Sequence, residues 1–86
     1  DAELDTLRRR IEQALSAYDP RLSVHDFRMV RGKQHTNVIF DMVVPEDLQG
    51  ETATLRRLVN ETLHQSGDQY FAVITFDCEA FNELSR

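Results

Sequence analysis

The chain has 86 residues, with 15 acidic and 10 basic side chains and a net charge of −5. We expect one domain over residues 1–86, because a chain of this length leaves no room for a second and builds only a thin core. Nucleic acid is not an expected partner, since a protein that neutralises phosphates carries a basic surplus on some face.

The apolar pattern predicts five elements, in the order helix, strand, strand, helix, strand. In the two helical segments apolar side chains recur every three or four residues, and the segments end at Asp19-Pro20 and at Ser66-Gly67. The strands are rich in β-branched and aromatic residues, and a four-residue turn joins the first two into a hairpin. The elements are expected at residues 4–18, 22–30, 36–44, 48–66 and 70–76.

This order predicts an α+β two-layer sandwich, with both helices on one face of a three-stranded sheet. Strand residues alternate between the two faces of a sheet. Strict alternation puts Val24, Val30, Val38, Phe40, Met42 and Val44 on one face, and Phe27, Met29, Ile39 and Val43 on the other. Because both faces are apolar, we expect the second face to meet a partner. We favour a homodimer through Phe27, Met29 and Ile39 over a cover from the tail, residues 80–86.

The second face also carries His25 and Asp41, which a hairpin centred near Lys33 places opposite each other. Directly opposed side chains of an antiparallel pair have Cβ atoms roughly 5 Å apart, so an imidazole and a carboxylate can share a divalent cation. Asp77 and Glu79 are alternate residues at the end of the last strand, and by the same alternation they fall on this second face. Such nitrogen and oxygen ligands suit zinc, manganese or iron. Chance alignment among the 15 acidic residues is the alternative.

Three further residues are weaker ligand candidates. His35 falls in the hairpin turn, where a histidine is ordinarily solvated. His64 falls near the C-terminus of a helix, where a partly charged imidazole interacts favourably with the helix dipole without any function. Cys78 follows Asp77, so the two point to opposite faces, and we read Cys78 first as a small buried residue.

Catalysis and an oxidising compartment are not expected. The chain has no glycine-rich phosphate loop, no HExxH motif and no nucleophile with an arranged base. A single cysteine cannot form an internal disulfide, so the cytoplasm is the expected location. No stretch reaches the roughly 18 apolar residues of a membrane span, and no signal peptide opens the chain. Because the sequence starts at Asp1 without a methionine, we expect it to be part of a longer protein.

Three segments resemble those of one protein family. They are Val24-His25-Asp26-Phe27-Arg28, His35-Thr36-Asn37-Val38-Ile39-Phe40-Asp41 and Val73-Ile74-Thr75-Phe76-Asp77. Over nearly its whole length the chain resembles the C-terminal cytoplasmic domain of cation diffusion facilitator transporters. The resemblance implies an αββαβ metallochaperone-like, ferredoxin-like fold and a homodimer. It also implies attachment to a transmembrane part in a bacterial inner or plasma membrane, and a regulatory role in divalent metal efflux.

The resemblance implies metal ligands at four positions. His25 matches the histidine of the family's first strand, and Asp41 matches a histidine or aspartate near the middle of the second. Asp77 lies where many members place an ion-bridging histidine, and Glu79 lies where they place a carboxylate. An aspartate in place of that histidine hardens the site toward oxygen ligands, which favours manganese or iron as alternatives to zinc, the ion expected first. Two other functions stay open: a constitutive dimerisation domain without bound metal, and a small-molecule sensor module.

Overall fold

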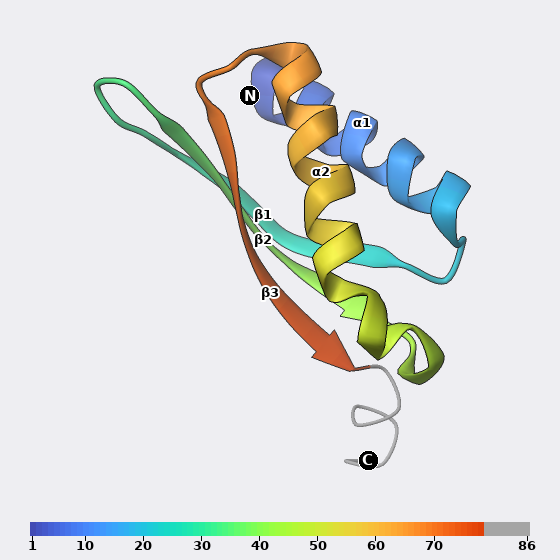
Figure 1. The fold of residues 1–86 in the computed structure, drawn as a ribbon. Coiled ribbons are helices and arrows are strands. Elements are labelled where there is room, and N and C mark those ends of the chain that lie inside the picture. Colours follow the sequence, from blue (N-terminus) through green and yellow to red (C-terminus); the bar gives the residue numbers. More distant parts are fainter. Residues whose placement is uncertain (79–86) are drawn as a thin grey trace.

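The computed structural model describes residues 1–78, which form one layer of helices and one layer of strands (Figure 1). Both helices lie on the same face of the sheet (Figure 1). The elements are α1 (Ala2–Tyr18), β1 (Ser23–Arg31), β2 (Thr36–Val44), the 3₁₀ helix η1 (Glu46–Glu51), α2 (Thr52–Ser66) and β3 (Tyr70–Cys78). The predicted α+β fold with the order αββαβ is therefore confirmed.

The sheet is mixed, with the strand order β1-β2-β3. β1 and β2 form the predicted antiparallel hairpin, whereas β3 runs parallel to β2 on its other side. A parallel neighbour needs a crossover connection, and α2 supplies it by passing over the sheet (Figure 1). β2 is thus the central strand, and β1 and β3 each keep one edge that pairs with no strand of residues 1–78.

The core lies between the helices and one face of the sheet. β2 alternates strictly, and its inward side chains are almost completely buried. Apolar side chains at helical spacing on α1 and α2 pack against them, because each helix turns one apolar stripe toward the sheet. The principal core residues are Leu7, Ile11, Leu15, Val38, Phe40, Met42, Val44, Leu55, Val59 and Leu63.

Element boundaries agree with the prediction within two residues except at the second helix, which begins at Thr52 rather than at residue 48. The six residues before it form η1, in which the amide of Leu48 donates to the carbonyl of Pro45 at 3.0 Å. The amide side chain of Gln49 also donates to the carbonyl of Val44 at 2.8 Å. An apolar residue at this spacing fits a 3₁₀ turn as well as an α-helix, so periodicity could not separate the two.

A β-bulge interrupts β1. His25 pairs with Asp41 and Arg28 pairs with Ile39, so Asp26 and Phe27 together face the single residue between those partners. Asp26 has a φ of 56°, in the left-handed region that aspartate adopts more readily than most residues. One inserted residue reverses the alternation of every side chain that follows it in β1.

The bulge shows that the predicted face was wrong for Phe27 and Met29. The ring of Phe27 stacks on that of Phe40, with 5.2 Å between ring centroids, on the helix side of the sheet. Met29 also packs against the core, where it pairs with buried Val38. Val30, predicted to point inward, is 56% exposed and lies on the other face. Strict alternation failed here because it cannot register an inserted residue.

Arg31 gives independent support for the reversed alternation. Its guanidinium contacts the carboxylates of Asp1 and Glu3 at 3.0 and 2.7 Å, and both of those residues belong to the start of α1. The Glu3 carboxylate also accepts a hydrogen bond from the Tyr70 hydroxyl at the start of β3. Arg31 can reach these groups because the bulge turns it toward the helices.

Candidate metal site on the open face

We call the sheet face opposite the helices the open face. It carries alternate residues of the three strands, and the bulge determines which residues of β1 belong to it. By register these residues are Ser23, His25, Arg28 and Val30 of β1, Asn37, Ile39, Asp41 and Val43 of β2, and Phe71, Val73, Thr75 and Asp77 of β3. Ile39 and Val43 therefore lie on the face predicted for them.

Near the hairpin the open face carries four apolar side chains, with Arg28 and Asn37 in the same rows of the sheet. Val30, Phe71 and Val73 are 56%, 38% and 46% exposed, and Ile39 beside Val73 is half-buried. These four side chains come from all three strands and lie in adjacent rows of the sheet. We call them the apolar patch. An exposed cluster of this kind is typical of a contact surface.

The opposite end of the open face is polar and acidic. The structure confirms the predicted pairing of His25 with Asp41 across β1 and β2. Asp77 pairs with Val43 and so lies one row further along, diagonal to Asp41. Glu79, the fourth predicted ligand, lies outside the described residues. The structure thus brings together His25 and Asp41 directly and places Asp77 within electrostatic reach.

Asp26 is a member of this acidic end that the sequence did not predict. Its carboxyl group lies close to that of Asp41, whose pKa it raises through a hydrogen bond and through its charge, and its own backbone is left-handed at the bulge. Strict alternation assigned Asp26 to the helix side. The only available signal was that aspartate is one of the few residues that tolerate the left-handed conformation.

The pKa of the Asp41 carboxyl is raised above its usual value. Loss of hydration is the largest cause, followed by the hydrogen bond with Asp26 and the negative charges of Asp26 and Asp77, while the charge of Arg28 acts in the opposite direction. Crowded carboxylates favour any cation that neutralises them. This end of the face therefore has the electrostatic character of a cation site.

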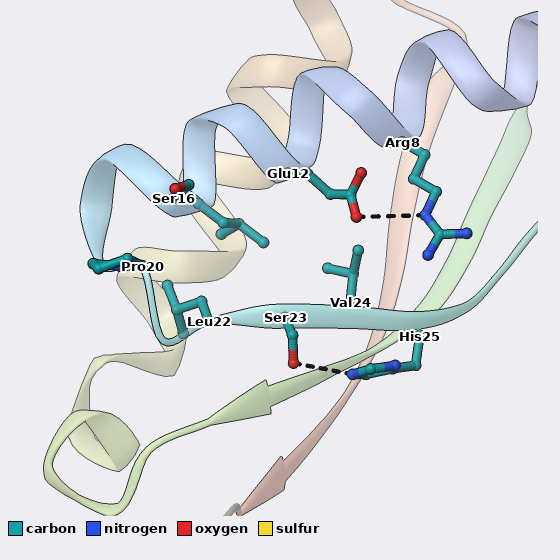
Figure 2. A pocket seen from close by; sticks show the side chains of 9 residues that line it. Arg8, Glu12, Ser16, Pro20, Leu22, Ser23, Val24 and His25 are labelled. Carbon is teal, nitrogen blue, oxygen red and sulfur yellow. Dashed lines mark hydrogen bonds and ion pairs between the residues drawn. The ribbon is translucent and has the colours of Figure 1, made fainter.

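His25 has a defined hydrogen bond within its own strand. Its ring atom Nε2 lies 3.0 Å from Oγ of Ser23, and both side chains point away from α1, whereas Val24 between them points toward it (Figure 2). A pocket between α1 and β1 reaches from Arg8 and Glu12 to His25 (Figure 2). His25 thus stands where this pocket meets the open face.

The weaker ligand candidates lie elsewhere. The His35 ring packs edge-on against Phe71 at 4.7 Å, near the hairpin and away from His25. His64 on α2 contacts the same phenyl ring at 5.8 Å. Cys78 is half-buried and pairs with buried Val44, so it faces the opposite side of the sheet from Asp77.

One copy of the chain does not assemble a complete metal site from the part that the structure describes. Within residues 1–78, no three side chains of His, Cys, Asp or Glu converge closely enough to hold an ion. The imidazole and carboxylates at the acidic end suit a divalent cation in kind, but they are too few in one chain.

None of the helices in residues 1–78 has the length and apolar character needed to cross a membrane.

Comparison with known proteins supports the fold. No protein-family model and no curated protein sequence matches the chain. Two solved structures that concern the mode of action of CzrB, a candidate zinc transporter, are similar to it with a TM-score of 0.77 each. The zinc form is 22% identical, over 92% of this chain and 88% of that one. The other is 24% identical, over 91% and 94%. The fold implied by the sequence resemblance is therefore confirmed.

Proposed function

We propose that the chain is the C-terminal cytoplasmic domain of a cation diffusion facilitator transporter and regulates efflux of a divalent metal ion. The observation that carries this proposal is the pairing of His25 with Asp41 on the face opposite the helices. The similarity in fold to two structures of CzrB, one of them a zinc form, supports membership of the cation diffusion facilitator family. In this function the domain is not an enzyme and is attached to a transmembrane part.

The domain forms a homodimer in which two open faces meet. The apolar patch supplies the contact that does not depend on metal, since burying each such side chain is worth about 1.5–3 kcal/mol. Ile39 keeps the interface role that the sequence predicted. The other members of the apolar patch take the place of Phe27 and Met29, whose side chains pack against the core.

The acidic ends of the two copies supply the metal ligands together. Each chain offers His25 and Asp41 as a pair, with Asp26 and Asp77 close by, and Glu79 completes the set proposed from the resemblance. Carboxylates brought face to face repel one another, and a divalent cation between them removes that repulsion. The ion therefore binds the closed dimer more tightly and shifts the population toward it.

Zinc is the ion we propose first. An imidazole nitrogen with carboxylate oxygens is a common zinc ligand set, and two chains bring enough groups for four-coordination. Manganese and iron are the alternatives, because carboxylates dominate this end of the face.

Calorimetric titration with Zn²⁺, Mn²⁺ and Fe²⁺, combined with sedimentation analysis, tests this function. We expect saturable binding that is lost in His25→Ala, and a dimer that closes or strengthens when metal is added. Gln65→Ala is the control, because Gln65 is exposed on α2, on the helix side of the sheet, and should leave binding unchanged. Equal affinity in His25→Ala and the wild type would refute the site.

The apolar patch favours one second candidate, a constitutive dimerisation domain of the same fold. Such a domain would stay dimeric without metal and would show the same mass and melting temperature with each of the three ions. The third alternative, a small-molecule sensor module, is supported by the fold but by no other observation in residues 1–78.

A further inference from the structure

The contact between Ser23 and His25 bears on which ring nitrogen of His25 can hold an ion. Ser23 is half-buried, His25 is exposed, and the two are neighbours on the open face of β1. The 3.0 Å contact joins the serine hydroxyl to Nε2 (Figure 2). Within residues 1–78, the Ser23 hydroxyl is the hydrogen-bond partner found for the His25 ring, so this hydroxyl orients the ring.

A neutral imidazole carries one proton, and the position of that proton decides which nitrogen is a ligand. If the Ser23 hydroxyl donates to Nε2, the proton sits on Nδ1 and neither nitrogen has a free lone pair. If Nε2 donates to the hydroxyl oxygen, the lone pair of Nδ1 is free. Only the second arrangement allows His25 to bind an ion while it keeps its contact with Ser23.

The position of Asp41 favours Nδ1 for a separate geometric reason. Nδ1 is bonded to the ring carbon that carries Cβ, so along the side chain it lies closer to the backbone of His25 than Nε2 does. Aspartate has the shorter of the two carboxylate side chains, and Asp41 stands directly across from His25. With Cβ atoms roughly 5 Å apart and metal–ligand bonds of about 2 Å, an ion close to the sheet meets both groups. An ion at Nε2 would have to displace the Ser23 hydroxyl, which lies 3.0 Å from that nitrogen.

We propose that Ser23 is a positioning residue that accepts a hydrogen bond from Nε2 of His25 and leaves Nδ1 as the metal-binding nitrogen. This inference rests on the proposed function for the identity of the ligand as a divalent metal ion. Partners of this kind orient a ligating histidine, and their removal typically lowers metal affinity about 10- to 100-fold. Because this contact is near the surface, we expect a loss at the lower end of that range.

Nitrogen-15 NMR of the metal-free domain gives the first test, at about pH 9, where imidazoles are neutral. The chain contains three histidines, and the spectra of His35→Ala and His64→Ala assign the signals of His25 by elimination. We expect His25 to carry its proton on Nε2. A proton found mainly on Nδ1 would overturn the inference, whether or not the domain binds metal.

Metal affinity gives the second test, with zinc as the titrant. Ser23→Ala should weaken zinc binding about tenfold, and Ser23→Thr, which keeps the hydroxyl, should restore it. Ser16→Ala is the matched control, because Ser16 lines the opposite wall of the same pocket on α1 (Figure 2). Unchanged affinity in Ser23→Ala, or a loss that Ser23→Thr does not rescue, contradicts a positioning role.

Cadmium-113 substitution gives the third test, because one-bond coupling identifies the nitrogen that holds the ion. Coupling to Nδ1 of His25 supports the inference, and coupling to Nε2 overturns it. If the wild-type domain binds neither zinc nor cadmium, the proposed function fails. The proton position in the metal-free domain then decides the role of Ser23 by itself.

Discussion

The two faces of the sheet follow different rules although the same strands build both. The face under the helices is apolar over most of its length, and the inward residues of β2 from Val38 to Val44 are completely buried. The open face is divided into the apolar patch near the hairpin and an acidic end around Asp41. Burial against helices requires only apolar side chains of suitable volume. On a face that is apolar at one end and acidic at the other, each residue must lie at a particular position. The bulge at Asp26 determines which residues of β1 occupy those positions.

Removing the largest side chain of the buried face should have the largest effect. Phe40 is completely buried and stacks on Phe27, so Phe40→Ala should cost about 3–5 kcal/mol of unfolding free energy. Ile39→Ala, one residue earlier on the open face, should cost about 1 kcal/mol in the monomer. Urea unfolding at low protein concentration measures both. Equal costs would mean that the two faces are not different in packing.

A charge on the apolar patch should break the dimer without breaking the fold. Val73→Glu should weaken dimerisation about 100-fold, because it places a carboxylate in an apolar contact. Phe27→Glu is the informative comparison. It should lower the melting temperature, because the Phe27 ring packs on Phe40 in the core. Sedimentation and thermal unfolding separate the outcomes, and a folded monomeric Phe27→Glu would restore the interface that strict alternation predicts.

The bulge can be tested at its left-handed residue. Asp26→Gly should stabilise the domain by up to about 1 kcal/mol, whereas Asp26→Val should destabilise it by about 1–2 kcal/mol, because only the first removes the strain at a φ of 56°. Asp26→Asn controls for the loss of charge beside Asp41, since asparagine tolerates the same backbone. If Asp26→Val is as stable as Asp26→Asn, β1 does not carry the bulge in solution.

The smallest effect should come from the ion pairs that the bulge brings to the helix side. The pKa of Glu3 is lowered from 4.5, mainly by the hydrogen bond from Arg31 and then by that from Tyr70. A carboxyl whose pKa is lower in the folded than in the unfolded state stabilises the fold at pH values above its unfolded-state pKa. That stability is lost as the pH falls through its folded-state pKa. We expect a slight drop in melting temperature below about pH 4.5 that Glu3→Gln removes. An identical acid profile in Glu3→Gln would mean that the ion pair of Glu3 with Arg31 adds no stability in solution.

The sequence was sufficient for the fold because its strongest signals are regular. Helical spacing, the hairpin turn and the alternation of β2 each depend on an unbroken period, and the structure keeps those periods. The pairing of His25 with Asp41 follows from a hairpin centred near Lys33. The pairs between the turn and the bulge are offset by one residue from that centre, and the bulge cancels the offset at His25. The faces of Phe27, Met29 and Val30 were not predictable, since an inserted residue leaves no periodic signal. The same insertion hid Asp26 as a neighbour of Asp41.

The parallel pairing of β2 with β3 also has a consequence for the order of folding. Hairpin pairs join residues as close as Arg31 and Thr36, whereas every β2–β3 pair joins residues 34 positions apart, from 36 with 70 to 44 with 78. Closing the longer loop costs more chain entropy, so we expect the hairpin to assemble early and β3 to dock late. During that interval the second edge of the central strand is unpaired. A newly made chain is then most exposed to pairing with another copy of itself.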